Sequence, residues 1–216
     1  YTTSDVVEKF CEEGIRYGAA AICVNPVHVA LVKKHLMGTG IKTSVVVGFP
    51  LGANKTSTKA FETREAVRDG ADEIDMVINI GALREGDYAY VLEDIKAVVQ
   101  AAGRAAVKVI IETCYLTKEQ KIKACALSKQ AGAAFVKTST GMGTGGATEE
   151  DVRLMKEAVG EGMFVKASGG VDNRAAAYKM LRAGADRLGV SRVPQIVADD
   201  TEQDSVSKHN QPPVCG

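Results

Sequence analysis

Three helical stretches of this sequence end in the same dipeptide, Gly-Ala, and a short β-rich run follows each one directly. The dipeptides are Gly70-Ala71, Gly132-Ala133 and Gly184-Ala185. Glycine ends a helix readily because it adopts left-handed backbone conformations at no steric cost. A helix-to-strand turn that recurs in this way is typical of βαβ units, whose strands form a parallel sheet.

Helical and β-rich segments alternate along most of the chain. We expect helices at 4–13, 28–37, 58–69, 88–102, 118–131, 149–159 and 173–183, and strands at 19–26, 43–50, 73–80, 105–112, 134–140, 163–170 and 187–191. Thr117 with Gln120, and Asp172, are expected to cap two of these helices. The pattern predicts an α/β fold, the (β/α)8 TIM barrel, with its first strand missing from a sequence that starts at a helix cap.

The domain organisation follows from the same pattern. Residues 1–197 are expected to form one barrel domain, a size that buries a substantial core without disulfides or metals. Residues 198–216 are polar and contain two adjacent prolines, so we expect a disordered tail.

Composition excludes several classes of protein. The 27 basic and 27 acidic residues cancel, so no overall charge attracts nucleic acid or an anionic membrane surface. No apolar run is long enough to span a bilayer, which argues against a membrane protein. The five cysteines form no Cys-x-x-Cys pair and only three histidines are present, so we expect no structural zinc site. We also expect no cofactor. Unpaired thiols suit a reducing, cytoplasmic location.

Three lysines lie within apolar, strand-like runs, and burial of an ammonium group costs several kcal/mol or lowers its pKa. They are Lys108 in Ala-Val-Lys-Val-Ile, Lys137 in Phe-Val-Lys-Thr and Lys166 in Phe-Val-Lys-Ala. A deprotonated lysine can attack a carbonyl group and form a Schiff base. Each lysine alone could equally lie at a strand end or in a buried ion pair, but three at equivalent positions favour a functional site.

Barrel geometry adds a carboxylate to this set. The side chains of a strand alternate between its two faces, which places Asp75 opposite Ile74 and Met76. With Asp75, Lys137 and Lys166 inside one barrel, a positive charge on Lys166 would make Lys137 lose its proton more readily, and Asp75 could relay protons. Alternatively, Asp75 forms a buried salt bridge that neutralises Lys108, and the two roles can coexist.

A second group of residues is suited to binding a phosphate. Ser168-Gly169-Gly170 precedes a helix and would present backbone N–H groups to an anion, and Ser191 and Arg192 follow the last strand. Barrels commonly bind phosphate at the loops after strands seven and eight, although an ordinary glycine-rich turn is the alternative. The stretch 141–146 matches G-x-G-x-x-G, but the next strand lacks the acidic residue of a dinucleotide site.

Four motifs in order resemble those of the deoxyribose-phosphate aldolase family, a class I aldolase family. They are Ala71-Asp-Glu-Ile-Asp-Met-Val, Lys108-Val-Ile-Ile-Glu-Thr, Phe135-Val-Lys-Thr-Ser-Thr-Gly and Lys166-Ala-Ser-Gly-Gly-Val. The resemblance extends over roughly residues 3–197. It implies cleavage of 2-deoxyribose 5-phosphate to glyceraldehyde 3-phosphate and acetaldehyde, in deoxyribonucleotide catabolism, by a cytoplasmic homo-oligomer that needs no metal.

The resemblance also implies roles for individual residues. Lys137 matches the Schiff-base lysine, and Asp75 and Lys166 match the proton donor and acceptor. Residues expected to bind substrate or support the site are Lys108, Thr140, Gly169, Gly170, Ser191, Arg192, Cys23 and Asn25. Cys23 could instead be a small buried core thiol.

Two features depart from the family pattern. Family members carry a strand containing Asp-His-Thr-Leu-Leu-Lys before the first helix, which this sequence lacks. Arg192 replaces the second serine of a Gly-x-Ser-Ser turn, where it could add a charge-assisted phosphate contact or crowd the site. Another Schiff-base phosphosugar aldolase or transaldolase, or an impaired barrel that binds a phosphosugar, remain the alternative interpretations.

Overall fold

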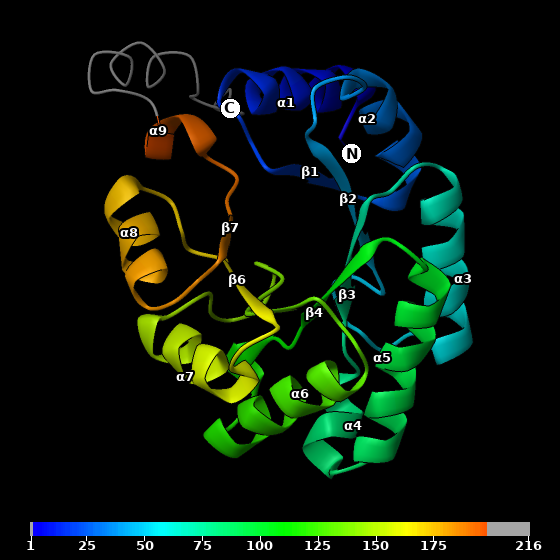
Figure 1. Ribbon diagram of the computed structural model, residues 1–216, viewed down its shortest axis with the longest axis vertical. Helices are drawn as coiled ribbons and strands as arrows, with labels where there is room; N and C mark the ends of the chain where they lie inside the picture. The colour runs from blue at the N-terminus through cyan, green and yellow to red at the C-terminus, as the bar shows by residue number, and fades with distance from the viewer. Residues whose placement is uncertain (1, 198–216) are drawn as a thin grey trace, which may run out of the picture.

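A curled, seven-stranded parallel sheet forms the centre of the protein in a computed structural model that describes residues 2–197 (Figure 1). The strands pair in chain order, from β1 to β7. They are β1 (Ala21–Val24), β2 (Lys42–Val47), β3 (Glu73–Val77), β4 (Ala106–Ile110), β5 (Phe135–Lys137), β6 (Phe164–Ser168) and β7 (Arg187–Gly189). The parallel α/β barrel architecture expected from the sequence is confirmed, with β1 and β7 at the two edges of the described sheet.

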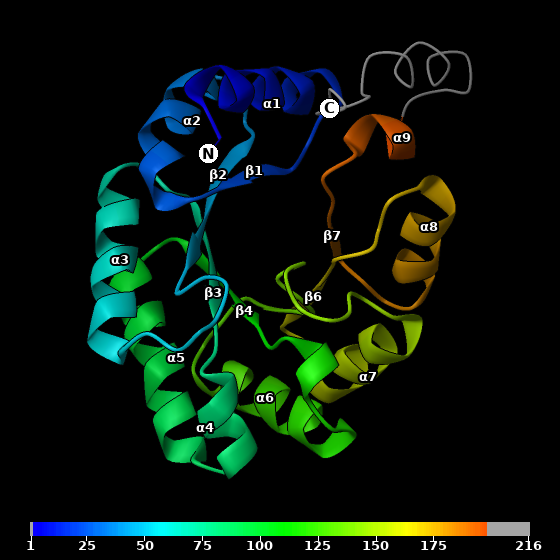
Figure 2. The ribbon, with the colours of Figure 1, turned by 180° about the vertical axis from the view of Figure 1, so that it is seen from behind.

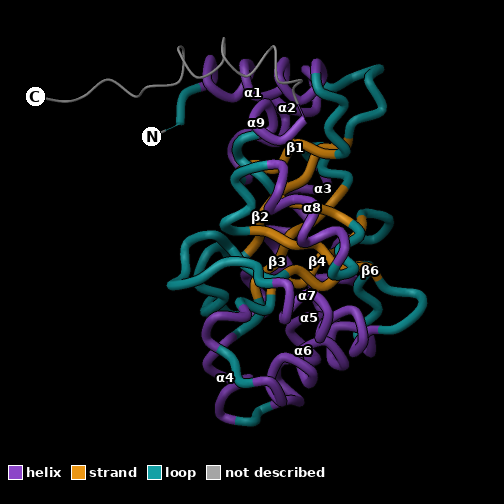
Figure 3. The backbone as a smooth tube through the Cα atoms, turned by 90° about the vertical axis from the view of Figure 1, so that its left-hand side faces the viewer, coloured by secondary structure: helices purple, strands orange, loops and turns teal. Residues whose placement is uncertain are grey.

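Helices surround the outside of this sheet, as the views from the front, back and side show (Figures 1, 2 and 3). They are α1 (Ser4–Arg16), α2 (Val29–His35), α3 (Thr56–Arg68), α4 (Ile80–Glu85), α5 (Tyr88–Ala102), α6 (Lys118–Gln130), α7 (Glu149–Val159), α8 (Arg174–Arg182) and α9 (Val193–Val197), with 3-10 turns at Pro26–His28 and Thr113–Tyr115. No helix among residues 2–197 is both long and apolar enough to cross a membrane.

Strand alternation separates an apolar outer face from a polar interior. In β3, the side chains of Ile74 and Met76 are fully buried in the core between the sheet and the helices. Asp75 lies on the opposite, inner face, where it is also fully buried. A parallel sheet covered by helices needs apolar residues on the covered face, so polar groups on the inner face require partners of their own.

The Gly-Ala turns have one common geometry. The N–H of Gly70 donates to the carbonyl of Val67 at 3.1 Å, and the N–H of Ala71 donates to the carbonyl of Ala66 at 2.9 Å. Gly132-Ala133 and Gly184-Ala185 repeat the same two bonds, and all three glycines have positive φ. This is the Schellman arrangement, which satisfies the last carbonyl groups of a helix and turns the chain toward the next strand.

Several expected boundaries and caps differ from the structure. The strand expected at 73–80 ends at Val77, because Asn79 accepts a hydrogen bond from the N–H of Ala82 and starts α4. Asp172 was expected to cap α8, which is wrong: the side chain of Asn173 accepts from the N–H of Ala176. The capping box of Thr117 and Gln120 is confirmed. The expected disordered tail, 198–216, lies outside the described residues.

Helices α3 and α5 are joined by a fully buried ion pair. The Nζ atom of Lys59 lies 2.6 Å from Oδ2 of Asp94 and donates to the carbonyl of Val77 at 2.9 Å. The hydroxyl of Thr56 donates to the other oxygen of Asp94 at 2.9 Å. Because every charge in this cluster has partners, the helices are held in place just beyond the end of β3.

Replacement of Lys59 by Met is expected to destabilise the fold by about 3–5 kcal/mol, because it leaves the carboxylate of Asp94 buried without a countercharge. Urea unfolding would measure the loss. Lys33→Met is the matched control, since it removes the half-exposed pair of Lys33 with Asp72 and is expected to cost less than about 1 kcal/mol. Equal losses in the two variants would contradict this account of the buried pair.

Candidate active site

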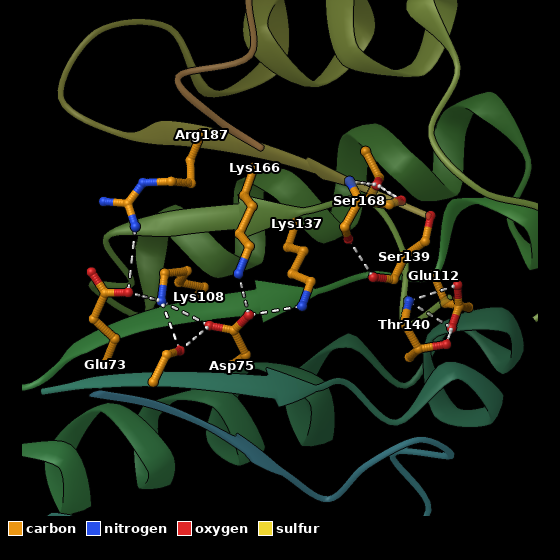
Figure 4. A network of polar contacts seen from close by, with 12 residues as sticks. Glu73, Asp75, Lys108, Glu112, Lys137, Ser139, Thr140, Lys166, Ser168 and Arg187 are labelled. Carbon is orange, nitrogen blue, oxygen red and sulfur yellow. Dashed lines mark hydrogen bonds and ion pairs between the residues drawn. The ribbon is translucent and has the colours of Figure 1, made fainter. Parts of the chain in front are cut away.

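The carboxylate of Asp75 is the centre of the polar interior (Figure 4). Its Oδ2 atom lies 2.7 Å from the Nζ atom of Lys137 and 2.7 Å from the Nζ atom of Lys166. Its Oδ1 atom lies 2.8 Å from the Nζ atom of Lys108 and accepts a hydrogen bond from Ser44 at 3.2 Å. Four strands, β2, β4, β5 and β6, therefore send a side chain to one carboxylate on β3.

The strand register explains why these side chains meet. Asp75 pairs with Lys108 in the register of β3 and β4, and Lys137 pairs with Lys166 in that of β5 and β6. Residues in register on parallel strands point to the same face of the sheet. The structure thus brings Asp75, Lys137 and Lys166 together, as expected from their positions in the sequence.

A second carboxylate, that of Glu73, lies on the same face of β3 as Asp75, two residues closer to the start of the strand. The Oε2 atom of Glu73 lies 2.6 Å from the Nζ atom of Lys108 and 3.6 Å from the guanidinium of Arg187. Both cations also lie over the ring of Phe135, at 5.9 Å and 5.7 Å from its centre. Lys108 is therefore held between two carboxylates, so it has the buried ion-pair role that the sequence left open.

The charges in this cluster set the protonation of its members. Burial alone would raise the pKa of Asp75, but Lys137, Lys166 and Lys108 hold that pKa well below its usual range. Burial alone would lower the pKa of Lys166, but Asp75, with help from Cys23 and Glu73, raises it above its ordinary value. Asp75 is therefore ionised and Lys166 protonated at neutral pH.

At the carboxyl ends of β4 and β5, the side chain of Glu112 contacts Thr140 (Figure 4). Both carboxylate oxygens accept from the N–H of Thr140, each at 3.2 Å, and the hydroxyl of Thr140 also donates to Oε2. Thr140 was expected to contact substrate. Its hydroxyl donates to Glu112 and accepts from the N–H of Met142, so its donor and one of its two acceptor positions are already in use.

The expected phosphate site lies at the carboxyl end of β6. The hydroxyl of Ser168 donates to the carbonyl of Ser139 at 2.7 Å, and Gly169 and Gly170 both have positive φ. This bond joins the end of β6 to the segment that follows β5, directly before the glycine pair. Ser191 and Arg192 are exposed on the turn after β7.

The remaining expected residues lie on β1 or just after it. Cys23 is half-buried rather than a fully buried core thiol, and it lies in register with Ser44, whose hydroxyl donates to Asp75. Asn25 is exposed, and its side chain does not cap the 3-10 turn that follows. Among residues 2–197, no group of His, Cys, Asp and Glu side chains is arranged to hold a metal ion.

Sequence reasoning missed four residues of this network. Glu73 and Arg187 share the inner face with the lysines, and Ser44 does so on β2. A period-two count from Asp75 would have placed Glu73 on the inner face. Glu112 belongs to the motif that begins at Lys108, but nothing in its local sequence indicates that it contacts Thr140.

The chain matches the model of the DeoC/LacD family aldolases over residues 3–211. It belongs to this family. Its members are lyases, and the match includes all the strands and helices described above.

Individual relatives agree with this assignment. The chain is 56% identical over 198 residues to the deoxyribose-phosphate aldolase of Clostridium tetani, a match that covers 91% of this chain and 92% of the relative. It is 57% identical to that of Thermococcus gammatolerans over 201 residues, with 91% and 89% covered. The tetrameric deoxyribose phosphate aldolase of Aeropyrum pernix superposes with a TM-score of 0.85 at 29% identity, with 95% and 86% covered.

Replacement of Asp75 by Asn is expected to destabilise the protein by about 3–5 kcal/mol at neutral pH, because three amines then lose their shared carboxylate. Burial without a countercharge lowers the pKa of a lysine, so the folded variant binds fewer protons than its unfolded chain. Its stability should rise with pH up to the ordinary lysine pKa of about 10.4.

The wild type should behave in the opposite way, because Lys166 has a raised pKa in the folded state. Its contribution to stability is present below the ordinary lysine pKa and is lost as pH rises through the folded pKa. The gap between wild type and variant should therefore narrow toward alkaline pH in urea-unfolding series. A gap that stays constant with pH would contradict the shared-charge account.

Proposed function

We propose that this aldolase reversibly cleaves 2-deoxy-D-ribose 5-phosphate to D-glyceraldehyde 3-phosphate and acetaldehyde, through a Schiff base on Lys137. The observation that carries the proposal is the pair of amines, Lys137 and Lys166, that share one oxygen of Asp75 at 2.7 Å each. The names of the relatives from Clostridium tetani and Thermococcus gammatolerans support the choice of substrate.

Contacts distinguish the three lysines. Lys108 is fully buried and lies between two carboxylates, so it is the least available for attack on a substrate. Lys166 has a raised pKa, which suits a proton donor. Lys137 has one carboxylate partner, shared with Lys166, and lies near the carboxyl end of β5, where barrel enzymes place their reactive groups. We therefore assign the nucleophile to Lys137.

The reaction begins when the neutral amine of Lys137 adds to the C1 aldehyde and forms a C–N bond. Lys166 protonates the resulting hydroxyl group, which leaves as water and gives an iminium ion. Lys166, left neutral by that step, then takes the proton of the C3 hydroxyl through a water hydrogen-bonded to Asp75, and the C2–C3 bond breaks. Its electrons flow into the iminium, so an enamine remains on Lys137 while glyceraldehyde 3-phosphate departs.

Return of a proton to C2 of the enamine restores the iminium of acetaldehyde. Water adds to this iminium, and acetaldehyde leaves with Lys137 again a free amine. In the resting site Asp75 is ionised, because the three lysines lower its pKa, and its carboxylate holds the two amines and the relay water in place. The iminium itself accepts the electrons of the broken bond, so the chemistry requires no cofactor.

The phosphate of the substrate is placed at Gly169 and Gly170, with Ser191 and Arg192 on the neighbouring turn. Glycines with positive φ in such a turn can direct successive backbone N–H groups toward an anion. Cys23 and Asn25, at the end of β1, are placed on the rim of the same site.

The setting of the enzyme is proposed from its relatives and composition. The tetramer of the Aeropyrum pernix relative supports a homo-oligomer. The balanced charge argues against nucleic-acid partners, and an odd, scattered set of cysteines suits the cytoplasm, where deoxyribonucleotide catabolism would supply the substrate.

Incubation with acetaldehyde followed by borohydride is expected to leave a reduced ethyl adduct on Lys137 alone, located by peptide mass spectrometry. The adduct should be absent from Lys137→Leu. A folded wild type that forms no adduct, or forms it on Lys108, would contradict the assignment.

Replacement of Lys166 by Leu tests the proton donor separately. We expect turnover of 2-deoxyribose 5-phosphate to fall about 10²–10⁴-fold, the usual contribution of a general acid–base group. The adduct on Lys137 should still form, more slowly, because the nucleophile remains. A donor screen with other aldehydes and ketones would reveal a different phosphosugar aldolase if acetaldehyde proved a poor donor.

A further inference from the structure

Glu112 has an unusual backbone conformation. It is the only non-glycine residue among 2–197 with a positive φ, at 53°, and only 2% of its surface is exposed. Left-handed backbone at a residue with a long side chain costs about 1 kcal/mol or more, and such strain persists only where other contacts enforce it. The mechanism proposed above does not use this residue.

The side chain of Glu112 contacts the start of the loop between β5 and α7. As described above, its carboxylate accepts the N–H and the hydroxyl of Thr140, and the thiol of Cys114 approaches Oε1 at 3.9 Å. The hydroxyl of Thr140 in turn accepts the N–H of Met142 at 2.9 Å. Glu112 therefore orders the first residues of this loop through a chain of hydrogen bonds.

The loop backbone also lies directly against Glu112 and its neighbour. A Cβ atom at Gly143 would lie 2.9 Å from the sulfur of Cys114 and 3.3 Å from the carboxyl carbon of Glu112. Only glycine fits so close an approach, so the loop and the carboxylate are packed against each other.

The other end of the loop lies against the proposed phosphate site. The N–H of Ala147 donates to the carbonyl of Gly169 at 2.9 Å. A Cβ atom at Gly146 would lie 2.3 Å from that same carbonyl oxygen, so this position also requires glycine. The G-x-G-x-x-G pattern at 141–146 thus serves two close backbone approaches, one to Glu112 and one to Gly169.

We propose that Glu112 is a positioning residue for phosphate recognition: it fixes the loop 140–147 and, through that loop, the backbone of Gly169 and Gly170. Its own carboxylate would repel a phosphate, and both of its oxygens are already engaged by Thr140. This inference rests on the proposed function and deepens it, because it names a residue that positions the backbone proposed to bind the phosphate of the substrate.

The test compares two substrates that differ only in the phosphate, 2-deoxyribose 5-phosphate and 2-deoxyribose. Glu112→Asn is the main variant, since asparagine tolerates positive φ but is too short to make the same contacts with Thr140. We expect its kcat/KM for the phosphorylated sugar to fall about 10–100-fold, mostly through KM, as for a misplaced substrate contact. The value for 2-deoxyribose should change less than about twofold, because its reacting groups are unaffected.

Inorganic phosphate gives a second readout that does not depend on turnover of the sugar phosphate. Its inhibition constant, measured with 2-deoxyribose as substrate, should rise in Glu112→Asn by about the same 10–100-fold factor. The borohydride-trapped acetaldehyde adduct on Lys137 should form at the wild-type rate.

Glu62→Asn is a matched control, because the carboxylate of Glu62 also accepts a loop N–H, that of Gly48 after β2. It is expected to leave the preference for the phosphorylated sugar at the wild-type value. If Glu112→Asn does not fold, Glu112→Gln provides the test, since its amide keeps one acceptor and loses the other. It should shift the preference in the same direction by a smaller factor.

The outcomes separate the inference from the proposed function. Equal losses for both sugars, or an unchanged preference in the Glu112 variants, would overturn the positioning role even if the wild type is an active aldolase. A wild type that neither cleaves 2-deoxyribose 5-phosphate nor forms the adduct would overturn the proposed function itself.

Discussion

One buried carboxylate organises the interior of this barrel. Asp75 has no exposed surface, and the Nζ atoms of three lysines lie within 2.8 Å of its carboxylate. Removal of any charge from such a cluster leaves the others without compensation, which costs more than the intact cluster contributes to stability. The cluster is therefore better understood as a constraint on which groups carry protons than as a source of stability. The contacts of Glu73 contribute to this constraint. Glu73 engages Lys108 and Arg187, which leaves the second oxygen of Asp75 to Lys137 and Lys166.

The cluster depends on strand register. Lys137 and Lys166 lie opposite each other across β5 and β6, and both point inward because residues in register on parallel strands share a face. A slip of one residue in β5 would turn Lys137 into the apolar layer between the sheet and the helices, and would bring Val136 into the interior. Fully buried Val136 opposes that slip through its packing in the outer core. The apolar residues on either side of each lysine thus fix the strand register, and with it the direction in which the lysine side chain points.

Much of the fold and of the central cluster could be predicted from the sequence, because both depend on patterns that repeat over a few residues. The Gly-Ala turns and the alternation around Asp75 are local patterns, and both predicted the architecture and the three residues that meet at its centre. Other features depend on competition between neighbouring residues or on contacts between residues far apart in the sequence. Asp172 and Asn173 are both good caps, and only the packed helix shows that Asn173 is used. The contact of Glu112 with Thr140 joins residues 28 positions apart through a backbone conformation that no local pattern favours for glutamate.

The glycine-rich stretch at 141–146 shows why such a motif needs its structural context. Its spacing matches a dinucleotide-binding fingerprint, in which glycines let a helix and strand approach a pyrophosphate. Here the same residue type is required for a different reason, since Gly143 packs on Glu112 and Cys114 and Gly146 packs on Gly169. These glycines allow two segments of the protein to pack closely, and the proposed anion site is the adjacent backbone of Gly169 and Gly170. In the function proposed above, the barrel divides its work: inward side chains of β3 to β6 transfer protons, while backbone groups ordered by Glu112 bind the phosphate.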